Sequence, residues 1–249
     1  MHPVLSVKKY NKIKKFLPTV KHGPKRDHRM AISGMICVFK NGLPWRFMPE
    51  IYGKWYTVYN LFNRWSRKGI FRKIFTALNM NLKKRPVAMI DSASCKAHRT
   101  AASLKSDGKP RQIGRSRGGL NTKIHLICNE NFQPLDFKIT PGQESDTTVG
   151  HEMISQNLHR MKNILADRAY DSNKIRNILA SKKVAVCIPP KSNRIDDIPY
   201  DRVVYRQRHK IENMFGWLKD WRGVALRCHR NAHTFESLVG LALVVKFLM

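Results

Sequence analysis

Three carboxylates stand out because of where the sequence puts them. Asp91 follows the short apolar run 87–90, and Asp167 follows a second apolar run at 163–166. A carboxylate at the end of a buried strand is costly unless it is paired or binds a metal ion. Glu212 joins them from a helical segment. Together they would form an all-oxygen site that suits Mg²⁺ or Mn²⁺, and two such ions can drive an in-line attack on a phosphodiester.

The segment around Glu212 strengthens this interpretation. It holds four polar side chains spaced by three, four and seven residues: Tyr205, Arg208, Glu212 and Lys219. In a helix over about Tyr205–Trp221 they would lie within about a 60° arc. Glu212 would bind metal while Arg208 and Lys219 hold phosphate oxygens. Taken alone, the spacing fits equally well an exposed helix with an Arg208–Glu212 pair, and it is the two aspartates that favour the metal site.

The overall charge indicates a polyanionic partner. The 249 residues include 47 Lys and Arg against 17 Asp and Glu, a net charge of +30. A field of this size favours nucleic acid. Residues 1–86 carry 20 basic residues and two acidic ones, so the carboxylates are concentrated in the remainder. Charge names a class of partner and no activity, because ribosomal proteins share this bias.

The first part of the chain predicts helices. Asp27 is placed to cap a helix from His28 to about Lys40. Helical stretches follow at about Lys54–Lys68 and from Ile70 to about Leu82. Three short helices rich in Lys, Arg and aromatic residues indicate a helix-turn-helix-like module that contacts DNA. The alternative is a plain helical bundle whose basic face is only solvated.

The second part changes to short strands alternating with helices. Strands are expected at Val87–Ile90, Thr122–Cys128, Leu135–Thr140, Asn163–Ala166 and Val184–Ile188, and helices at His151–Met161, Ser172–Lys182 and Tyr205–Trp221. The second and third strands form a hairpin. This order predicts an α/β fold with a mixed sheet of about five strands and helices on its faces, and sites in such sheets gather at strand ends.

At this point the sequence resembles a known family, the transposases of the IS5 group of bacterial insertion sequences, which have an RNase H-like core. The Tyr205/Arg208/Glu212/Lys219 pattern matches the family signature at every spacing. The other matching segments are Met89–Ser92, Ile113–Gly119, Thr122–His125, Pro141–Gln143 and Ala166–Asp171, with Asn41–Arg46 and Trp55–Asn60 in the first part. The resemblance covers nearly the whole chain.

The resemblance implies a DDE mechanism. Asp91, Asp167 and Glu212 would be the catalytic residues and would hold two Mg²⁺ or Mn²⁺ ions. Water would cut the element's ends, and the freed 3′-hydroxyls would attack target DNA. The implied domains are a helical DNA-binding domain at 1–85 and an RNase H-like catalytic domain at 86–249. DNA or phosphate contacts are expected from six side chains, namely Tyr205, Arg208, Lys219, Arg115, Arg117 and Lys123.

The expected partner is therefore double-stranded DNA, both the terminal inverted repeats and the target, bound by a homodimer. A flexible basic loop at about 99–121, carrying Arg115 and Arg117, is expected to grip phosphates. No small-molecule substrate and no cofactor besides the metal ions are expected. The five cysteines have irregular spacing, which argues against disulfides and zinc fingers and favours the bacterial cytoplasm, at the nucleoid. The apolar run Leu238–Val245 is too short to span a membrane and predicts a buried terminal helix.

For several residues, and for the function as a whole, the sequence also allows a second interpretation. Glu144 and Asp146 are more simply explained by helix capping or loop hydrogen bonds than by metal binding. Asp171 is expected to cap a helix, and His125 to be structural. Two alternatives to the enzyme remain, a catalytically decayed copy or other DNA-binding protein without activity, and a structural RNA-binding protein. The latter would not need carboxylates at strand ends.

Overall fold

The computed structural model describes residues 4–18, 27–80, 86–102, 111–195 and 198–249. The chain divides into two compact units. The first comprises residues 1–81, 98–111 and 218–249, and the second comprises residues 82–97 and 112–217. The division expected from the sequence, with domains at 1–85 and 86–249, stays a prediction; by contacts, residues 218–249 belong to the helical unit.

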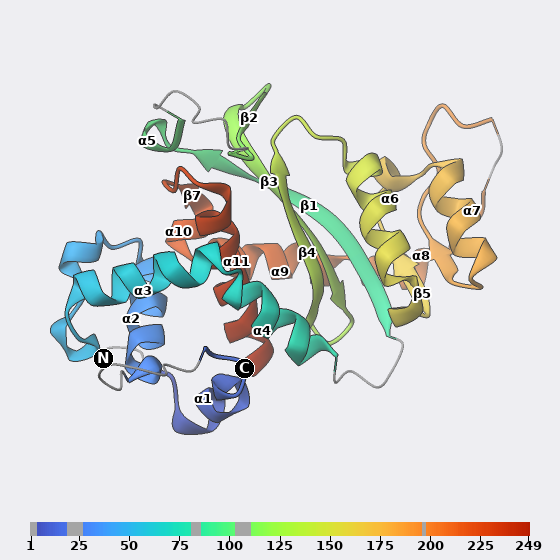
Figure 1. Ribbon diagram of the computed structural model, residues 1–249. Coiled ribbons are helices and arrows are strands. Elements are labelled where there is room, and N and C mark those ends of the chain that lie inside the picture. Colours follow the sequence, from blue (N-terminus) through green and yellow to red (C-terminus); the bar gives the residue numbers. More distant parts are fainter. Residues whose placement is uncertain (1–3, 19–26, 81–85, 103–110, 196–197) are drawn as a thin grey trace. The chain divides into compact units, whose positions relative to one another are not determined.

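The first unit is helical (Figure 1). Its elements are α1 (Val7–Lys14), α2 (His28–Asn41), η1 (Trp45–Phe47), η2 (Glu50–Tyr52), α3 (Trp55–Arg67), α4 (Ile70–Asn79), α5 (Arg99–Ala102), α10 (Arg222–Ala225), the short β7 (Leu226–Arg227) and α11 (Ala232–Leu248). Asp27 caps α2 by accepting a hydrogen bond from the Met30 N–H, as predicted. Gly69 links α3 to α4 with a φ of 62°, a left-handed conformation that glycine adopts without steric cost.

Helix α11 forms the centre of this unit. Eleven of its 17 residues are buried and none is exposed, and it contacts α2, α3 and α4. Helix α3 buries one face, formed by Val58, Leu61, Phe62 and Trp65, each at most 2% exposed. Among the described residues, no helix combines the length and apolar character that crossing a membrane requires. The predicted burial of the C-terminal helix is thus confirmed.

One arginine connects the separate segments of the helical unit. Arg227 is fully buried, with its guanidinium 4.9 Å from the ring centroid of Phe235. The Arg227 guanidinium donates to the backbone carbonyls of Arg111 at 2.6 Å and His229 at 3.0 Å. The backbone carbonyl of Arg227 accepts from the His98 N–H at 2.9 Å. These bonds attach His98 and Arg111 to the C-terminal part of the chain.

The second unit contains a mixed sheet with helices (Figure 1). Its strands are β1 (Val87–Ala97), β2 (Gly114–Ser116), β3 (Gly119–Asn129), β4 (Pro134–Pro141), β5 (Asn163–Leu165) and β6 (Ala185–Cys187). Its helices are α6 (Asp146–Asn157), η3 (Leu158–Arg160), η4 (Arg168–Tyr170), α7 (Asn173–Ser181), α8 (Arg202–Arg206) and α9 (His209–Lys219), whose last two residues belong to the other unit.

The strand pairing defines an RNase H-like order. β3 pairs with β4 and β1 in antiparallel fashion, and β5 runs parallel to both β1 and β6. The spatial order is therefore β4-β3-β1-β5-β6, with β2 beside the start of β3. This confirms the predicted mixed sheet, including the β3–β4 hairpin. The apolar core on one face joins β1 and β3 to α6 and α7 through Ile90, Ile127, Ile154 and Ile175.

Two local expectations are wrong. The first strand does not end at Asp91 but continues to Ala97, because β3 pairs with it along its whole length. The helix expected over Tyr205–Trp221 is broken into α8 and α9. Around the break, the N–H groups of Gln207, Arg208, Lys210 and Ile211 each bond three residues back, the tighter 3₁₀ pattern.

Part of the expected basic loop is also ordered structure. Gly114–Ser116 pairs with Gly119–Asn121, so that Arg115 lies on a short strand and Arg117 in the turn that follows it. The two-residue turn Arg117-Gly118 connects the strands of this hairpin. Residues 103–110, with the predicted loop's Lys105 and Lys109, lie outside the described residues.

Candidate active site

Two of the three predicted carboxylates meet at one guanidinium. Asp91 lies on β1, and Glu212 lies in the first turn of α9. Arg208, just before α9, donates from Nη1 to Asp91 Oδ2 at 2.9 Å and from Nη2 to Glu212 Oε1. The side chains of Asp91 and Arg208 are 18% and 19% exposed, while Glu212 is half exposed. A single cation therefore bridges both carboxylates.

Asp167 lies directly after β5, where it caps the short helix η4 by accepting from the Ala169 N–H at 2.9 Å. The negative charge of Asp167 acts on both Asp91 and Arg208. Burial raises the pKa of Asp91, Asp167 raises it further, and the bonds from Ser92 and Arg208 oppose this. Burial alone would lower the pKa of Arg208, but Asp91, Glu212 and Asp167 raise it overall. The electrostatics thus group the three carboxylates around Arg208.

Tyr205 completes this group from α8. Burial raises the pKa of its hydroxyl, opposed by the charge of Arg208 and a hydrogen bond to it. The break between α8 and α9 does not separate Tyr205 from Arg208 and Glu212. Lys219, the last residue of α9, is exposed and belongs to the other unit. The predicted single helical stripe is therefore replaced by a bent segment that keeps its first three members together.

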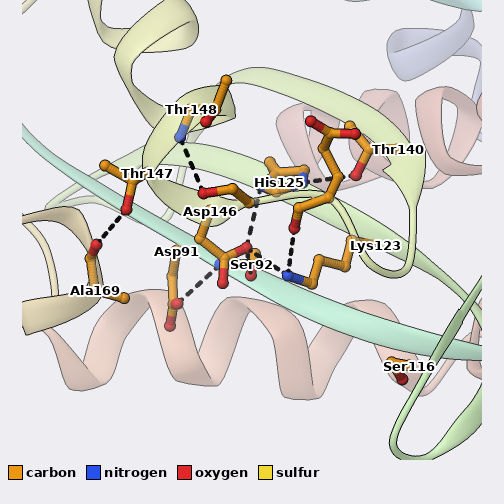
Figure 2. Close-up of polar contacts among 12 residues, drawn as sticks. Asp91, Ser92, Ser116, Lys123, His125, Thr140, Asp146, Thr147, Thr148 and Ala169 are labelled. Atoms are coloured by element: carbon orange, nitrogen blue, oxygen red, sulfur yellow. Dashed lines mark hydrogen bonds and ion pairs between the residues drawn. The ribbon is translucent and has the colours of Figure 1, made fainter.

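A second polar network lies on the opposite face of β1 (Figure 2). Strand register pairs Ser92 with His125 and Ser94 with Lys123, so these side chains share the face that α6 covers. Asp146 accepts from Ser92 Oγ at 2.8 Å and from Lys123 Nζ at 3.0 Å. The Ser92 N–H in turn donates to Asp91 Oδ1 at 2.8 Å. The network is thus linked to Asp91 through the backbone N–H of Ser92.

This arrangement changes the interpretation of Lys123. Its ammonium group also donates to the Glu144 carbonyl at 2.8 Å, and its side chain is only 17% exposed. The structure does not bring Lys123 to the face on which Asp91 meets Arg208. Sequence reasoning did not single out Ser92, and it weighed Asp146 as a helix or loop residue. No local pattern could have joined Asp146 to Lys123, because 23 residues separate them.

His125 is structural, as expected. It is fully buried, and its Nε2 lies 2.9 Å from Thr140 Oγ1. Burial lowers the pKa of His125 to about 4 despite the opposing charge of Asp146, so the imidazole is neutral at pH 7. Because the His125 ring is neutral, it needs no carboxylate partner in its buried position.

Asp171 does not cap α7, which was its expected role. Ser172 does so, by accepting from the Ile175 N–H. The side chain of Asp171 is buried and accepts hydrogen bonds from Arg176 Nε at 2.7 Å, Arg194 Nε at 2.9 Å and the Lys191 N–H at 2.8 Å. The correction follows from burial, since a carboxylate without solvent takes the strongest donors within reach. Asp171 thereby ties the segment after β6 to α7.

The donor set fits a hard divalent ion. Asp91 and Glu212 supply carboxylate oxygens that face one position already held by a positive charge, and such oxygens are the ligands that Mg²⁺ and Mn²⁺ prefer. In the part of the chain that the structure describes, no three His, Cys, Asp or Glu side chains form a ready-made metal site. Asp91 and Glu212 therefore lie around the Arg208 guanidinium, and it occupies the position that they share. None of the five cysteines forms a disulfide.

The sheet order and this carboxylate centre define a class of protein, and comparison with known families gives the same class. The family model described as "Transposase DDE domain" matches residues 82–246. A second, described as "Putative transposase of IS4/5 family", matches residues 5–75. The chain belongs to the DDE-domain transposases of insertion sequences. It is an enzyme that cleaves DNA and transfers strands.

Individual relatives are consistent with the family. The chain is 33% identical over 124 residues to a putative transposase for insertion sequence element IS6501 from Brucella ovis, a match that covers 49% of this chain and 95% of the relative. The Mos1 transposase paired-end complex with left transposon end matches over 98% of this chain and 88% of that one, at 12% identity and a TM-score of 0.29. A pre-cleavage Mos1 transpososome covers 93% and 81%, at 11% identity and a TM-score of 0.28. TM-scores this low carry no structural argument, so the fold assignment rests on the sheet order and the family.

Proposed function

We propose that this chain is an IS5-group transposase in which Asp91, Asp167 and Glu212 hold two divalent metal ions, Mg²⁺ or Mn²⁺. The observation that supports this most strongly is the Arg208 guanidinium held between two of the three carboxylates. Partly buried carboxylates that gather on one protein cation have the chemistry to gather on a metal ion instead. Burial raises the pKa of Asp91, and a cation bound beside it would oppose that effect.

The protein groups have separate tasks in this proposal. Bound at the carboxylates, the ions would activate the attacking oxygen and stabilise the leaving 3′ oxygen. Arg208 releases Asp91 and Glu212 and turns its donors to a phosphate oxygen of the DNA. Tyr205 stays beside Arg208 and orients it. Ser92, anchored by Asp146, holds the Asp91 carboxylate through its backbone N–H.

The reaction has two chemical steps. A water oxygen attacks phosphorus at the element's end, the P–O3′ bond breaks, and a 3′-hydroxyl and a 5′-phosphate result. The 3′-hydroxyl then attacks a phosphodiester of target DNA, forms a new P–O3′ bond and releases a 3′-hydroxyl of the target. Two chains, acting as a homodimer in the bacterial cytoplasm at the nucleoid, bring two terminal inverted repeats together. Arg115 and Arg117, both exposed, supply contacts to the DNA backbone.

A cleavage assay tests the proposal directly. A supercoiled plasmid carrying the element's two ends is incubated with the protein in Mg²⁺, Mn²⁺ or EDTA. We expect cuts at the ends in either metal, none in EDTA, and a loss of at least a hundredfold in Glu212→Gln, since one missing metal ligand removes several kcal/mol of transition-state stabilisation, about 2.7 kcal/mol per hundredfold.

Glu152→Gln serves as the matched control. It makes the same chemical change on α6, where Glu152 is exposed and pairs with Lys138. This variant should cut like the wild type. DNA binding without cutting, in every metal and in all three proteins, would instead identify a catalytically decayed DNA-binding copy.

A further inference from the structure

Helix α3 of the helical unit has an outer face made of side chains that can read DNA bases. Its inner face is packed, as described above. The outer side chains are Tyr56, Tyr59, Asn60, Asn63, Arg64 and Arg67, and of these only Asn63 is partly buried. At about 100° per residue, Asn60, Asn63, Arg64 and Arg67 occupy about 100° of the helix circumference. The helix contains no acidic residue, so this face carries only positive charge and amides.

The polar groups of this face are not engaged within the protein. Asn60, Asn63, Arg64 and Arg67 make no side-chain hydrogen bond or ion pair with any residue in the described part of the chain. Arg72 on the next helix behaves differently, since it donates to Glu236 at 3.0 Å. Unengaged amide and guanidinium donors on a rigid helix are available to a ligand without the loss of an internal contact.

The neighbouring helices of the unit lack such a face. In α4 the exposed side chains are Lys73 and Thr76, and the helix packs against α11. Residues 31–39 of α2 are buried throughout. Helix α1 presents lysines, which are point charges and lack both the planar fork of arginine and the paired donor and acceptor of asparagine. Figure 1 shows α3 as a continuous helix between the η1–η2 segment and α4.

We propose that α3 enters the major groove of double-stranded DNA and that Asn60 and Arg64 read base edges there, with Asn63 and Arg67 on the next turn. An α-helix fits the major groove, where asparagine pairs with adenine and arginine with guanine, each through two hydrogen bonds. From Asn60 to Arg67 the helix rises about 10 Å, roughly three base-pair steps. Tyr56 and Lys54 lie at the start of α3, where they contact the DNA backbone.

The inference depends on the proposed function only in taking duplex DNA as the ligand, and its test needs no catalysis. The full chain selects from a pool of duplexes with a randomised centre, in EDTA. We expect the wild type to enrich a short motif. Asn60→Ala should lose the preference at one base pair, and Arg64→Lys, which keeps the charge but loses the planar fork, should lose it at a neighbouring one.

Affinities give the quantitative arm of the test. Each substitution should weaken binding to the selected duplex by about five- to 150-fold, the loss of one bidentate contact, and leave binding to a scrambled duplex near the wild-type value. Lys73→Gln on α4 is the control, and it should leave the selected motif unchanged. Thermal melting confirms that each variant is folded.

Three results would overturn the proposal. The wild type could enrich no motif, both substitutions could leave the motif unchanged, or they could weaken binding to selected and scrambled duplexes equally. A stronger affinity for single-stranded DNA or for RNA than for any duplex would also overturn it. None of these results affects metal-dependent cleavage, which tests the proposed function separately through Glu212→Gln.

Discussion

Arg208 links two of the three carboxylates of the candidate active site. Its guanidinium bonds Asp91 and Glu212 and offsets one of their two negative charges, and the three carboxylates raise its own pKa. Like charges gathered in a partly buried place repel one another unless a cation lies among them. Arg208 therefore holds these two carboxylates close together, and it would compete with a metal ion for the same oxygens.

This competition leads to a prediction at the residue scale. Arg208→Gln should bind Mn²⁺ several-fold more tightly than the wild type when no DNA is present, because the internal cation is gone. The same variant should cut DNA at least tenfold more slowly, since a phosphate contact worth about 1.4 kcal/mol or more is lost. Titration calorimetry with Mn²⁺ and the plasmid assay measure the two effects.

Arg206→Gln is the matched control, since Arg206 is exposed on α8 and forms no ion pair within the described residues. It should change neither quantity beyond the small effect of one lost surface charge. If Arg208→Gln weakened Mn²⁺ binding, the guanidinium would be a support for the site and not a competitor.

A second residue-scale prediction concerns Asp171. Burial alone would raise the pKa of Asp171, but hydrogen bonds from Arg194, the Lys191 N–H and Arg176 lower it to about 2. Its folded pKa is below the unfolded value of about 3.9, so it stabilises the fold above about pH 4, and this contribution is lost as the pH falls toward 2. Asp171→Asn should lower the free energy of unfolding at pH 7 by on the order of 3 kcal/mol.

The pH dependence distinguishes this explanation from a simple packing defect. In urea titrations from pH 7 down to about pH 2.5, the difference between wild type and Asp171→Asn should shrink as the pH falls below about 4. A difference that stayed constant over this range would show that the charge of Asp171 is not what stabilises the segment after β6.

At the scale of elements, α6 and η4 are joined by a contact that requires glycine. Tyr170 of η4 is buried, and an added Cβ at Gly150 of α6 would lie 2.4 Å from Tyr170 Cε1. Tyr170 follows Asp167 by three residues, so the packing of its ring fixes the turn that carries this carboxylate. Asp91, Asp146 and Asp167 all raise the pKa of its hydroxyl, after the larger effect of burial.

Gly150→Ala should therefore destabilise the catalytic unit by about 1–3 kcal/mol through overpacking and should slow cleavage by displacing Asp167. Gly216→Ala on α9 is the matched control, because an added Cβ there meets nothing within 4 Å. That variant should be as stable as the wild type or more stable by up to about 1 kcal/mol, since alanine favours a helix. Thermal unfolding measures both, and equal effects would rule out the Tyr170 contact as the cause.

At the scale of the whole molecule, the net charge of +30 governs DNA binding. Each phosphate that a lysine or arginine neutralises releases counter-ions, so the affinity depends steeply on salt. We expect the affinity for any duplex to fall by about a thousandfold or more between about 50 and 200 mM salt, as for proteins with six or more phosphate contacts. Fluorescence anisotropy with a labelled duplex measures the slope, and a slope corresponding to one or two contacts would contradict the prediction.

Much of the protein can be predicted from local sequence. The cap at Asp27, the β3–β4 hairpin and helix α3 depend on residues within a few positions of one another, and each was predicted within a few residues. The C-terminal end of β1 and the break before α9 were not predicted. Strand length depends on what pairs with it, and a 3₁₀ turn in a helical pattern leaves little trace in the spacing of polar residues.

Motif spacing and composition can be read without a fold, so they suffice to identify the family, a charge that favours a polyanionic partner and the candidate metal ligands. Which of these groups meet depends on the three-dimensional packing. Arg208 bonds Asp91 across 117 residues, Lys123 bonds Asp146, and residues 218–249 pack with the N-terminal helices. These contacts depend on strand register and on which apolar faces cover one another, and both are set by the packing of distant segments.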